Sequence, residues 1–136
     1  MTRVVLFQVK DVKEKLLRVT ETTTVHFEKK EPMLIVVEDE KTEQYVDELL
    51  WKTPANSFLP HVVANTPSTE FVVITRVKQN LNQAKYAFNL CSTPLLIDGL
   101  FRIVYDFEDL TSPHKKLLSS HRFDAYKRAQ WAIEAR

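Results

Sequence analysis

The chain has 136 residues, of which 44% are hydrophobic and 27% are charged, and its formal net charge is +1. This balance is typical of one globular domain, expected over residues 1–136, and excludes a disordered chain. The one glycine leaves no GxxxxGK[ST] or GxGxxG loop for a nucleotide, and the one cysteine allows no disulfide and no zinc-type cysteine spacing.

In chain order, the sequence predicts a strand at 4–7, a helix at 11–30, a strand at 33–37 and a helix at 41–51, then strands at 58–64, 71–74, 86–91 and 100–107 and a last helix at 112–135. The unbroken apolar run Met33 to Val37 is typical of a strand buried on both faces. We therefore expect an α/β fold: a layered, mostly parallel sheet with flanking helices, Rossmann-like in topology but without a phosphate-binding loop.

No segment resembles a signal peptide or approaches the roughly 20 apolar residues that span a bilayer. With a single cysteine, this favours a reducing, cytoplasmic location, away from membranes. We predict no cofactor and no bound metal. The neighbourhood of Cys91 is apolar, which predicts a core thiol rather than a nucleophile, and no serine or histidine stands in a catalytic motif.

An acidic cluster, Glu38-Asp39-Glu40 followed by Lys41, stands between the buried strand at 33–37 and the next helix. One interpretation is a Mg²⁺-dependent nuclease, with the carboxylates holding the metal and Lys41 contacting a phosphate. The other is helix capping, because carboxylates accept from the free N–H groups of a helix start. Capping is favoured, since no second carboxylate is predicted on a neighbouring strand end.

Large apolar side chains gather in the turn after the second predicted helix. Turns usually lie at the surface, and tryptophan is a favoured interface anchor, so this segment is a candidate for binding a protein partner. The alternative is that the same side chains close the core beneath the turn. The candidate residues are Leu50, Trp51, Pro54, Phe58, Leu59 and Pro60.

The last predicted helix lies in a basic segment: residues 113–136 hold six Lys or Arg against two acidic residues. At 100° per residue, Lys116, Phe123 and Lys127 fall within about 40° of each other, and Lys115, Arg122 and Tyr126 form a second row beside them. Leu118, Ala125, Ala129 and Ala132 are expected to face the sheet. The outward stripe of cations and aromatics suits a peptide that ends in an apolar residue and a carboxylate. Alternatives are a solvated helix face and a direct site for single-stranded DNA.

Two stretches of the chain carry distinctive motifs. The first runs from Met33 to His61: an apolar strand, the acidic turn, a helix ending Asp-Glu-Leu-Leu-Trp, and Ser-Phe-Leu-Pro-His. The second is Arg-Phe-Asp-Ala-Tyr-Lys at 122–127, in the last predicted helix. Both stretches resemble the chi subunit family of bacterial DNA polymerase III. Asp124 departs from the pattern, because family members often carry a basic residue there.

The resemblance implies a non-catalytic adaptor that links the clamp loader to single-stranded DNA-binding protein by gripping its acidic C-terminal tail. It also implies pairing with a psi subunit, and no direct contact with nucleic acid. The partner-subunit surface would be the apolar turn described above. The tail-binding residues would be Lys115, Lys116, Arg122, Phe123, Tyr126, Lys127 and Arg128.

Overall fold

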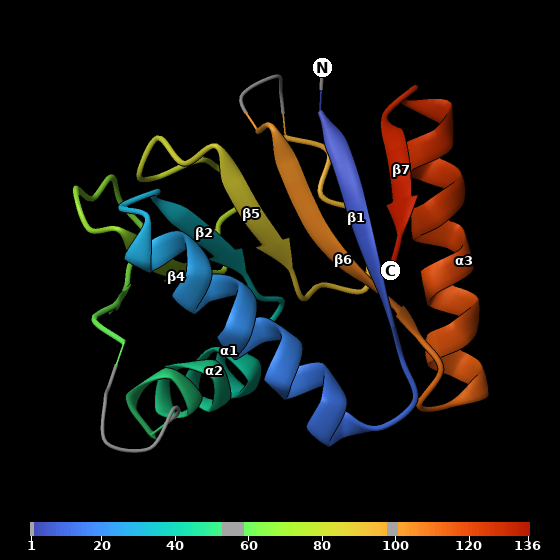
Figure 1. Ribbon diagram of the computed structural model, residues 1–136, viewed down its shortest axis with the longest axis horizontal. Helices are drawn as coiled ribbons and strands as arrows, with labels where there is room; N and C mark the ends of the chain where they lie inside the picture. Colours follow the sequence, from blue (N-terminus) through green and yellow to red (C-terminus); the bar gives the residue numbers. More distant parts are fainter. Residues whose placement is uncertain (1, 53–58, 98–100) are drawn as a thin grey trace.

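Within the described residues, seven strands form one sheet in the order β3-β4-β2-β5-β6-β1-β7, and each of their pairings is parallel (Figure 1). The structure, a computed structural model, describes residues 2–52, 59–97 and 101–136. The predicted α/β class with a parallel layered sheet is confirmed. The strands are β1 (Arg3–Val9), β2 (Met33–Val36), β3 (Val62–Val63), β4 (Val72–Thr75), β5 (Tyr86–Asn89), β6 (Ile103–Asp109) and β7 (Ala132–Ala135).

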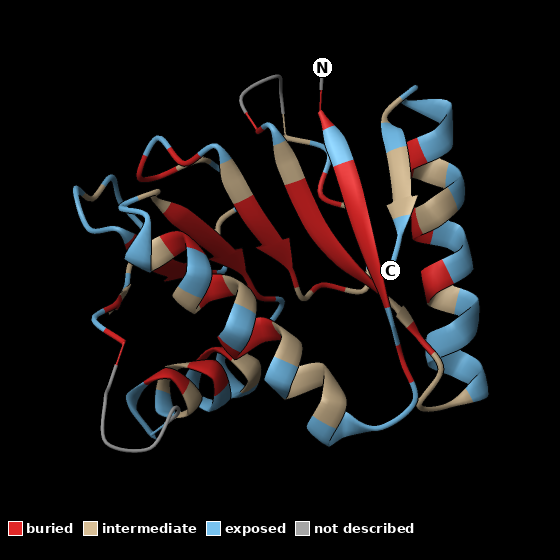
Figure 2. Cartoon of the chain, in the orientation of Figure 1, coloured by how far each residue is buried: buried red, intermediate tan, exposed pale blue. Residues whose placement is uncertain are grey.

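Three helices cover the two faces of this sheet. Helices α1 (Val12–Glu28) and α2 (Glu40–Lys52) lie over one face, whereas α3 (Pro113–Arg128) packs against the other. Because strand side chains alternate, Val5 and Phe7 of β1 belong to the first core layer and Val4 and Leu6 to the second. Burial is therefore continuous along the central strands (Figure 2). None of the helices in the described part of the chain is long and apolar enough to span a membrane.

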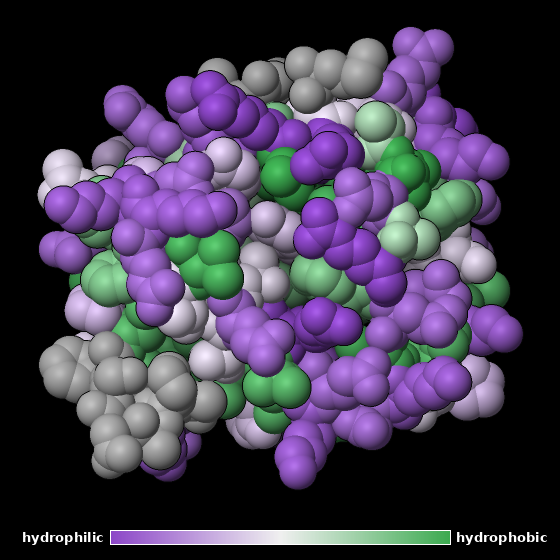
Figure 3. All heavy atoms as spheres, viewed as in Figure 1, coloured by the Kyte–Doolittle hydropathy of each residue, from purple (hydrophilic) through white to green (hydrophobic). Residues whose placement is uncertain are grey.

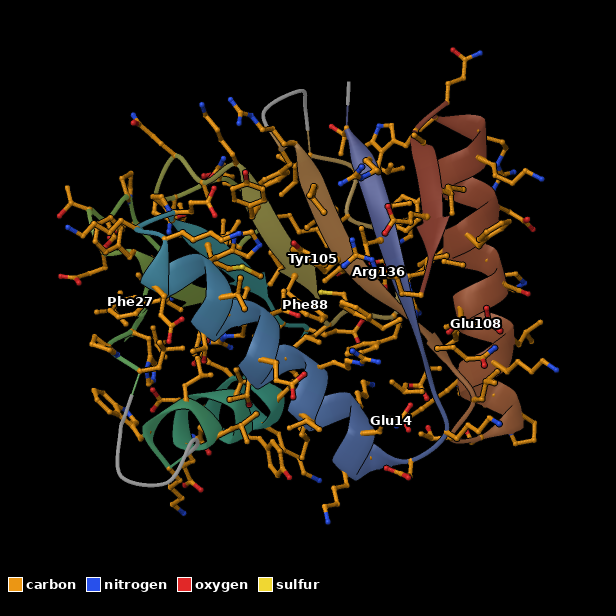
Figure 4. All side chains as sticks on the ribbon, viewed as in Figure 1. Glu14, Phe27, Phe88, Tyr105, Glu108 and Arg136 are labelled. Atoms are coloured by element: carbon orange, nitrogen blue, oxygen red, sulfur yellow. The ribbon has the colours of Figure 1, made fainter. Side chains whose placement is uncertain are left out.

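The aromatic core lies between the sheet and α1. Phe7 stacks on Tyr105 with ring centroids 5.9 Å apart, and Phe88 lies 5.1 Å from Phe107. Figure 4 labels Phe88 and Tyr105 in this layer. Such offset and tilted pairs contribute about 0.5–1.5 kcal/mol each beyond the area that they bury.

The helices begin at strong local signals. The Asp11 carboxylate accepts from the backbone N–H of Glu14 at 2.7 Å, and the Ser112 hydroxyl accepts from that of Lys115 at 3.1 Å. Pro113, whose missing N–H costs nothing in a first turn, follows Ser112. These caps agree with the predicted helix starts.

The helix ends carry a weaker signal. Two residues after the end of α1 and of α3, the backbone takes the left-handed conformation. These residues are Lys30, with φ 57°, and Gln130, with φ 64°. Glycine usually fills this position, and a residue with a side chain there costs about 1 kcal/mol. The one glycine of the sequence is at neither end, so no glycine marked them.

The prediction of one helix over 112–135 is wrong in its last part. The helix ends at Arg128, and the chain then turns back to form β7, which pairs in parallel with β1 from Arg3↔Ala132 to Leu6↔Ala135. The strand satisfies backbone groups of β1 that a longer helix would leave unpaired at the sheet edge.

The predicted strand at 58–64 is also shorter than expected. Only Val62 and Val63 pair, alongside Val73 and Ile74. Pro60 has no N–H to donate to a ladder, and the carbonyl oxygen of Leu59 is bonded by the His61 ring. Phe58 lies outside the described residues. The other predicted strands and helices are confirmed with shifts at their ends.

Candidate functional site

The inner face of α3 carries a buried ion pair. Arg122 and Tyr126, predicted on the exposed stripe, are 6% and 0% exposed, so that placement is wrong. The Arg122 Nε donates to Asp106 Oδ1 at 3.2 Å, and the Tyr126 hydroxyl donates to Asp106 Oδ2 at 2.6 Å. Asp106 lies in the middle of β6 and is buried.

The carboxylate of Asp106 decides which face of α3 meets the sheet. Burial raises its pKa, which the Arg122 guanidinium and the Tyr126 hydroxyl counteract. Asn89 Nδ2 donates a further hydrogen bond at 3.1 Å. A buried charge needs such partners, so the arginine and tyrosine turn inward and the alanine-rich side does not. The predicted inner face is therefore wrong: Ala125 is half-buried, and Ala129 and Ala132 follow the helix end and are exposed.

The outer face of α3 keeps the other predicted row. Lys116 and Lys127 are exposed, and Phe123 is half-buried against the second core layer. The Lys127 Nζ lies 5.6 Å from the centroid of the Phe123 ring. Neither lysine has an ion-pair partner within the described residues. The helix thus presents a ring between two cations that form no ion pair with any described residue.

A groove opens beside this row, between α3 and the strands β1 and β6. Its volume is about 220 Å³. Glu108, labelled in Figure 4, brings one carboxylate to the groove, where it accepts from Gln8 at 3.1 Å. The lining mixes apolar and polar side chains, which suits one apolar side chain with a polar backbone around it. Its lining residues are Leu6, Phe107, Glu108, Lys116, Ser119, Ser120 and Phe123. We call this the α3 groove.

The remaining predicted tail-binding residues are distributed around it. Arg128 is exposed at the last turn of the helix. Asp124 is exposed one residue after Phe123. Lys115 is exposed as well, but it lines a different cavity. The structure therefore brings Lys116, Phe123 and Lys127 together and separates them from Arg122 and Tyr126.

That second cavity, of about 340 Å³, lies at the carboxyl ends of β5 and β6, between the three helices. Doubly wound proteins often bind ligands at such an edge. Here the buried polar groups of the lining already have partners: Lys15 donates to Asp109 at 2.8 Å, and Arg122 is held by Asp106. On the face that Figure 3 shows, hydrophobic patches are separated by hydrophilic side chains. No buried polar group of the described lining is left to recognise a ligand.

One residue of the acidic cluster, Asp39, caps helix α2. The Asp39 carboxylate accepts from the N–H of Thr42 at 2.8 Å, and this backbone hydrogen bond is the main reason that its pKa is lowered. The Glu38 carboxylate accepts from the hydroxyl of Ser92. No three His, Cys, Asp or Glu side chains within the described ranges are placed to hold a metal ion. The geometry therefore agrees with the capping interpretation.

The apolar turn divides into buried and exposed parts. Leu50 and Leu59 belong to the core at 0% and 4% exposure, and the N–H of Leu59 donates to the carbonyl of Leu50 at 3.0 Å. Trp51 is 47% exposed and Pro60 is exposed. Pro54 and Phe58 lie outside the described residues. Core closure thus accounts for the leucines, and Trp51 with Pro60 remains as a surface.

Cys91 is a core thiol, as predicted. It is 6% exposed, and burial raises its pKa to about 11. The thiol therefore stays protonated at neutral pH and is a poor nucleophile.

Sequence reasoning missed the partners that organise the α3 region. Asp106 stands between Tyr105 and Phe107 in β6, and an acid flanked by apolar residues in a strand is a weak signal of a buried charge that needs a partner. The strand also carries Glu108 and Asp109, so this signal did not single out Asp106 or name its partner. Leu6 and Glu108, which complete the groove, come from strands far apart in sequence, and no local pattern marks them.

The comparisons with known proteins agree with this architecture. A family model described as DNA polymerase III chi subunit, HolC, matches residues 1–134. The chain belongs to the DNA polymerase III chi subunit family. The resemblance predicted from two short motifs is therefore confirmed over nearly the whole chain. A search of curated proteins finds no match to it.

Proposed function

We propose that this chi-family chain is an adaptor in the cytoplasm that links the clamp loader to single-stranded DNA-binding protein. It would do so by binding that protein's acidic C-terminal tail in the α3 groove. The family is a non-catalytic subunit of DNA polymerase III, which supports an adaptor rather than an enzyme. The observation that carries the proposal is Phe123 beside a groove, flanked by Lys116 and Lys127 without ion-pair partners in the described chain.

The chemistry of the groove fits the end of such a tail. Leu6 and Phe123 offer apolar area for the last side chain of the peptide. Lys116, in the same lining, would pair with the terminal carboxylate of the peptide. Lys127 and Arg128 extend the positive charge along the helix toward the acidic residues that precede the end. A short peptide buries little area, so we expect an affinity on the order of micromolar.

We assign Arg122 and Tyr126 a supporting part in this site. Both hold α3 against β6 through Asp106, which fixes the angle at which Phe123 faces the groove. They do not offer free charge or ring area to a peptide, because both are buried. Lys115 faces the other cavity and is not part of the proposed contact.

A partner subunit of the psi type is proposed for the surface around Trp51. The exposed indole and the neighbouring Pro60 give an apolar patch at the edge of the sheet, next to the short strand β3. Tryptophan at such a patch is a common anchor in protein interfaces. This surface is separate from the α3 groove, since β3 and β7 form opposite edges of the sheet.

The test of the tail site is a fluorescence-polarisation titration with a labelled acidic peptide that ends in an aromatic residue and a free carboxylate. We expect saturable binding that Phe123→Ala and Lys116→Ala each weaken about tenfold, because each removes one half of the recognition. Binding should also weaken as salt is raised, since the cations supply part of it. Unchanged binding in both variants would contradict the proposed site.

Lys115→Ala is the matched control, because it removes a lysine one residue away that lines the other cavity. It should leave the peptide affinity within about twofold of wild type, apart from the weak long-range effect of one surface charge. Glu108→Gln removes the carboxylate from the groove and should strengthen binding severalfold, as should Asp124→Lys. If the chain binds a single-stranded oligonucleotide and does not bind the peptide, the adaptor proposal is wrong and a DNA-binding module takes its place.

A further inference from the structure

His61 joins two segments of the chain through one ring. Its Nδ1 lies 2.6 Å from the carbonyl oxygen of Leu59, and its Nε2 lies 2.7 Å from Oδ1 of Asp47 on α2. The side chain of His61 is 0% exposed, whereas that of Asp47 is 37% exposed. The ring therefore ties the residues before β3 to the middle of α2, across 14 positions of sequence.

Both atoms that face the ring are acceptors. A carbonyl oxygen has no hydrogen to donate, so Nδ1 must carry one. The carboxylate of Asp47 also accepts, so the short contact at Nε2 needs a second hydrogen between the two atoms. A neutral imidazole with one hydrogen would leave two lone pairs facing each other at 2.7 Å. The contacts are satisfied when the ring is an imidazolium paired with the carboxylate.

The ring of His61 also supports Trp51. The centroids of the two rings are 4.4 Å apart with 45° between their planes. A cation within about 6 Å of an indole centroid is attracted by the ring, so an imidazolium at this distance interacts with the indole more strongly than a neutral ring does. Asp47 is one helical turn before Trp51 on α2, so the carboxylate, the ring and the indole form a continuous set.

We propose that His61 is a positioning residue: a doubly protonated ring, clasped between Asp47 and the Leu59 carbonyl, that holds the exposed indole of Trp51 in one orientation. The consequence for a protein partner rests on the proposed function of the Trp51 surface. The protonation of the His61 ring and the fixed orientation of the indole do not depend on that proposed function. The positioning role of His61 and the partner-binding role of Trp51 can therefore fail separately.

The first test uses the wild-type chain and NMR chemical shifts of the ring nitrogens of His61 at neutral pH. We expect both nitrogens to show shifts of the protonated type. In Asp47→Asn the side-chain amide can donate to Nε2, so the ring should revert to one protonated nitrogen. One unprotonated nitrogen in the wild type would overturn the proposal.

The second test measures the motion of Trp51. The chain has two tryptophans, so Trp131→Phe leaves Trp51 as the sole reporter in time-resolved fluorescence anisotropy. In this background His61→Gln should raise the amplitude of fast indole rotation about twofold, because the supporting ring is lost. Glu48→Gln is the matched control: it removes the next carboxylate on α2, whose partner is the exposed Lys52. Equal fast amplitudes in His61→Gln, the control and the parent would overturn the positioning role.

Discussion

The two sides of α3 both carry cations and aromatic rings, but one side packs on the sheet and the other lines a surface groove. The inner side has Arg122 and Tyr126, bonded to the buried Asp106, and the outer side has Lys116, Phe123 and Lys127 at a groove. A cation and an aromatic ring on a helix therefore do not define a binding stripe by themselves. The carboxylate on the facing strand decides which pair becomes core and which stays at the surface.

The comparison is tested most strongly by removing the inner cation. Arg122→Met leaves Asp106 buried without its ion-pair partner, which should lower the free energy of unfolding by about 3–5 kcal/mol. Urea denaturation followed by circular dichroism measures this. Arg128→Met, at an exposed position of the same helix, should change it by less than about 0.5 kcal/mol. Similar losses of unfolding free energy in the two variants would mean that the Arg122–Asp106 pair does not stabilise the fold more than an exposed cation does.

A smaller effect is expected from the inner hydroxyl. Tyr126→Phe keeps the ring but removes the donor to Asp106 and the acceptor for the N–H of Leu95, which should cost about 1–3 kcal/mol. On the outer side, Phe123→Leu keeps most of the buried apolar area, and a loss below about 1.5 kcal/mol is expected. Thermal unfolding of both variants compares the two sides directly; a larger loss for the outer variant would reverse the assignment.

The smallest predicted effect concerns the pH dependence of stability at the end of β6. Burial alone would raise the pKa of Asp109, but hydrogen bonds from Lys15 and Thr111 outweigh it and lower the pKa. A lowered folded-state pKa gives stability that is present above about pH 4, the usual value for an unfolded Asp, and is lost as the pH falls through the folded value.

Asp109→Asn should therefore flatten the loss of stability on acidification in this range. Lys15→Met should also flatten the loss of stability on acidification, because it removes the first of the hydrogen bonds that lower the pKa of Asp109. Urea midpoints between neutral and acidic pH measure the slope. An unchanged slope in both variants would show that this pair does not contribute to acid sensitivity.

The sequence was sufficient for the class of the fold. Apolar runs such as Met33 to Val37 predict buried parallel strands, and Asp11 and Ser112 mark helix starts through their side chains. The end of α3 was not predictable in the same way, because Gln130 takes the left-handed backbone in place of glycine. The strand β7 was missed for this reason.

The site was predictable only in part. Helical spacing correctly grouped Lys116, Phe123 and Lys127, since that grouping depends on the period of the helix alone. Which group faces the sheet depends on Asp106, a contact between elements that periodicity does not contain. The contact between Asp47 and His61 was not predictable for the same reason, because it joins helix α2 to the segment before β3.

The central claim is that the outer side of α3, and not its inner side or the larger cavity, binds an acidic tail. The most direct test is to map backbone amide chemical shifts by NMR while the acidic peptide is added. We predict that the largest shifts fall on Lys116, Ser120, Phe123 and Lys127. Largest shifts at Val12 and Tyr45, which line the larger cavity, would contradict the account and move the site to the carboxyl edge of the sheet.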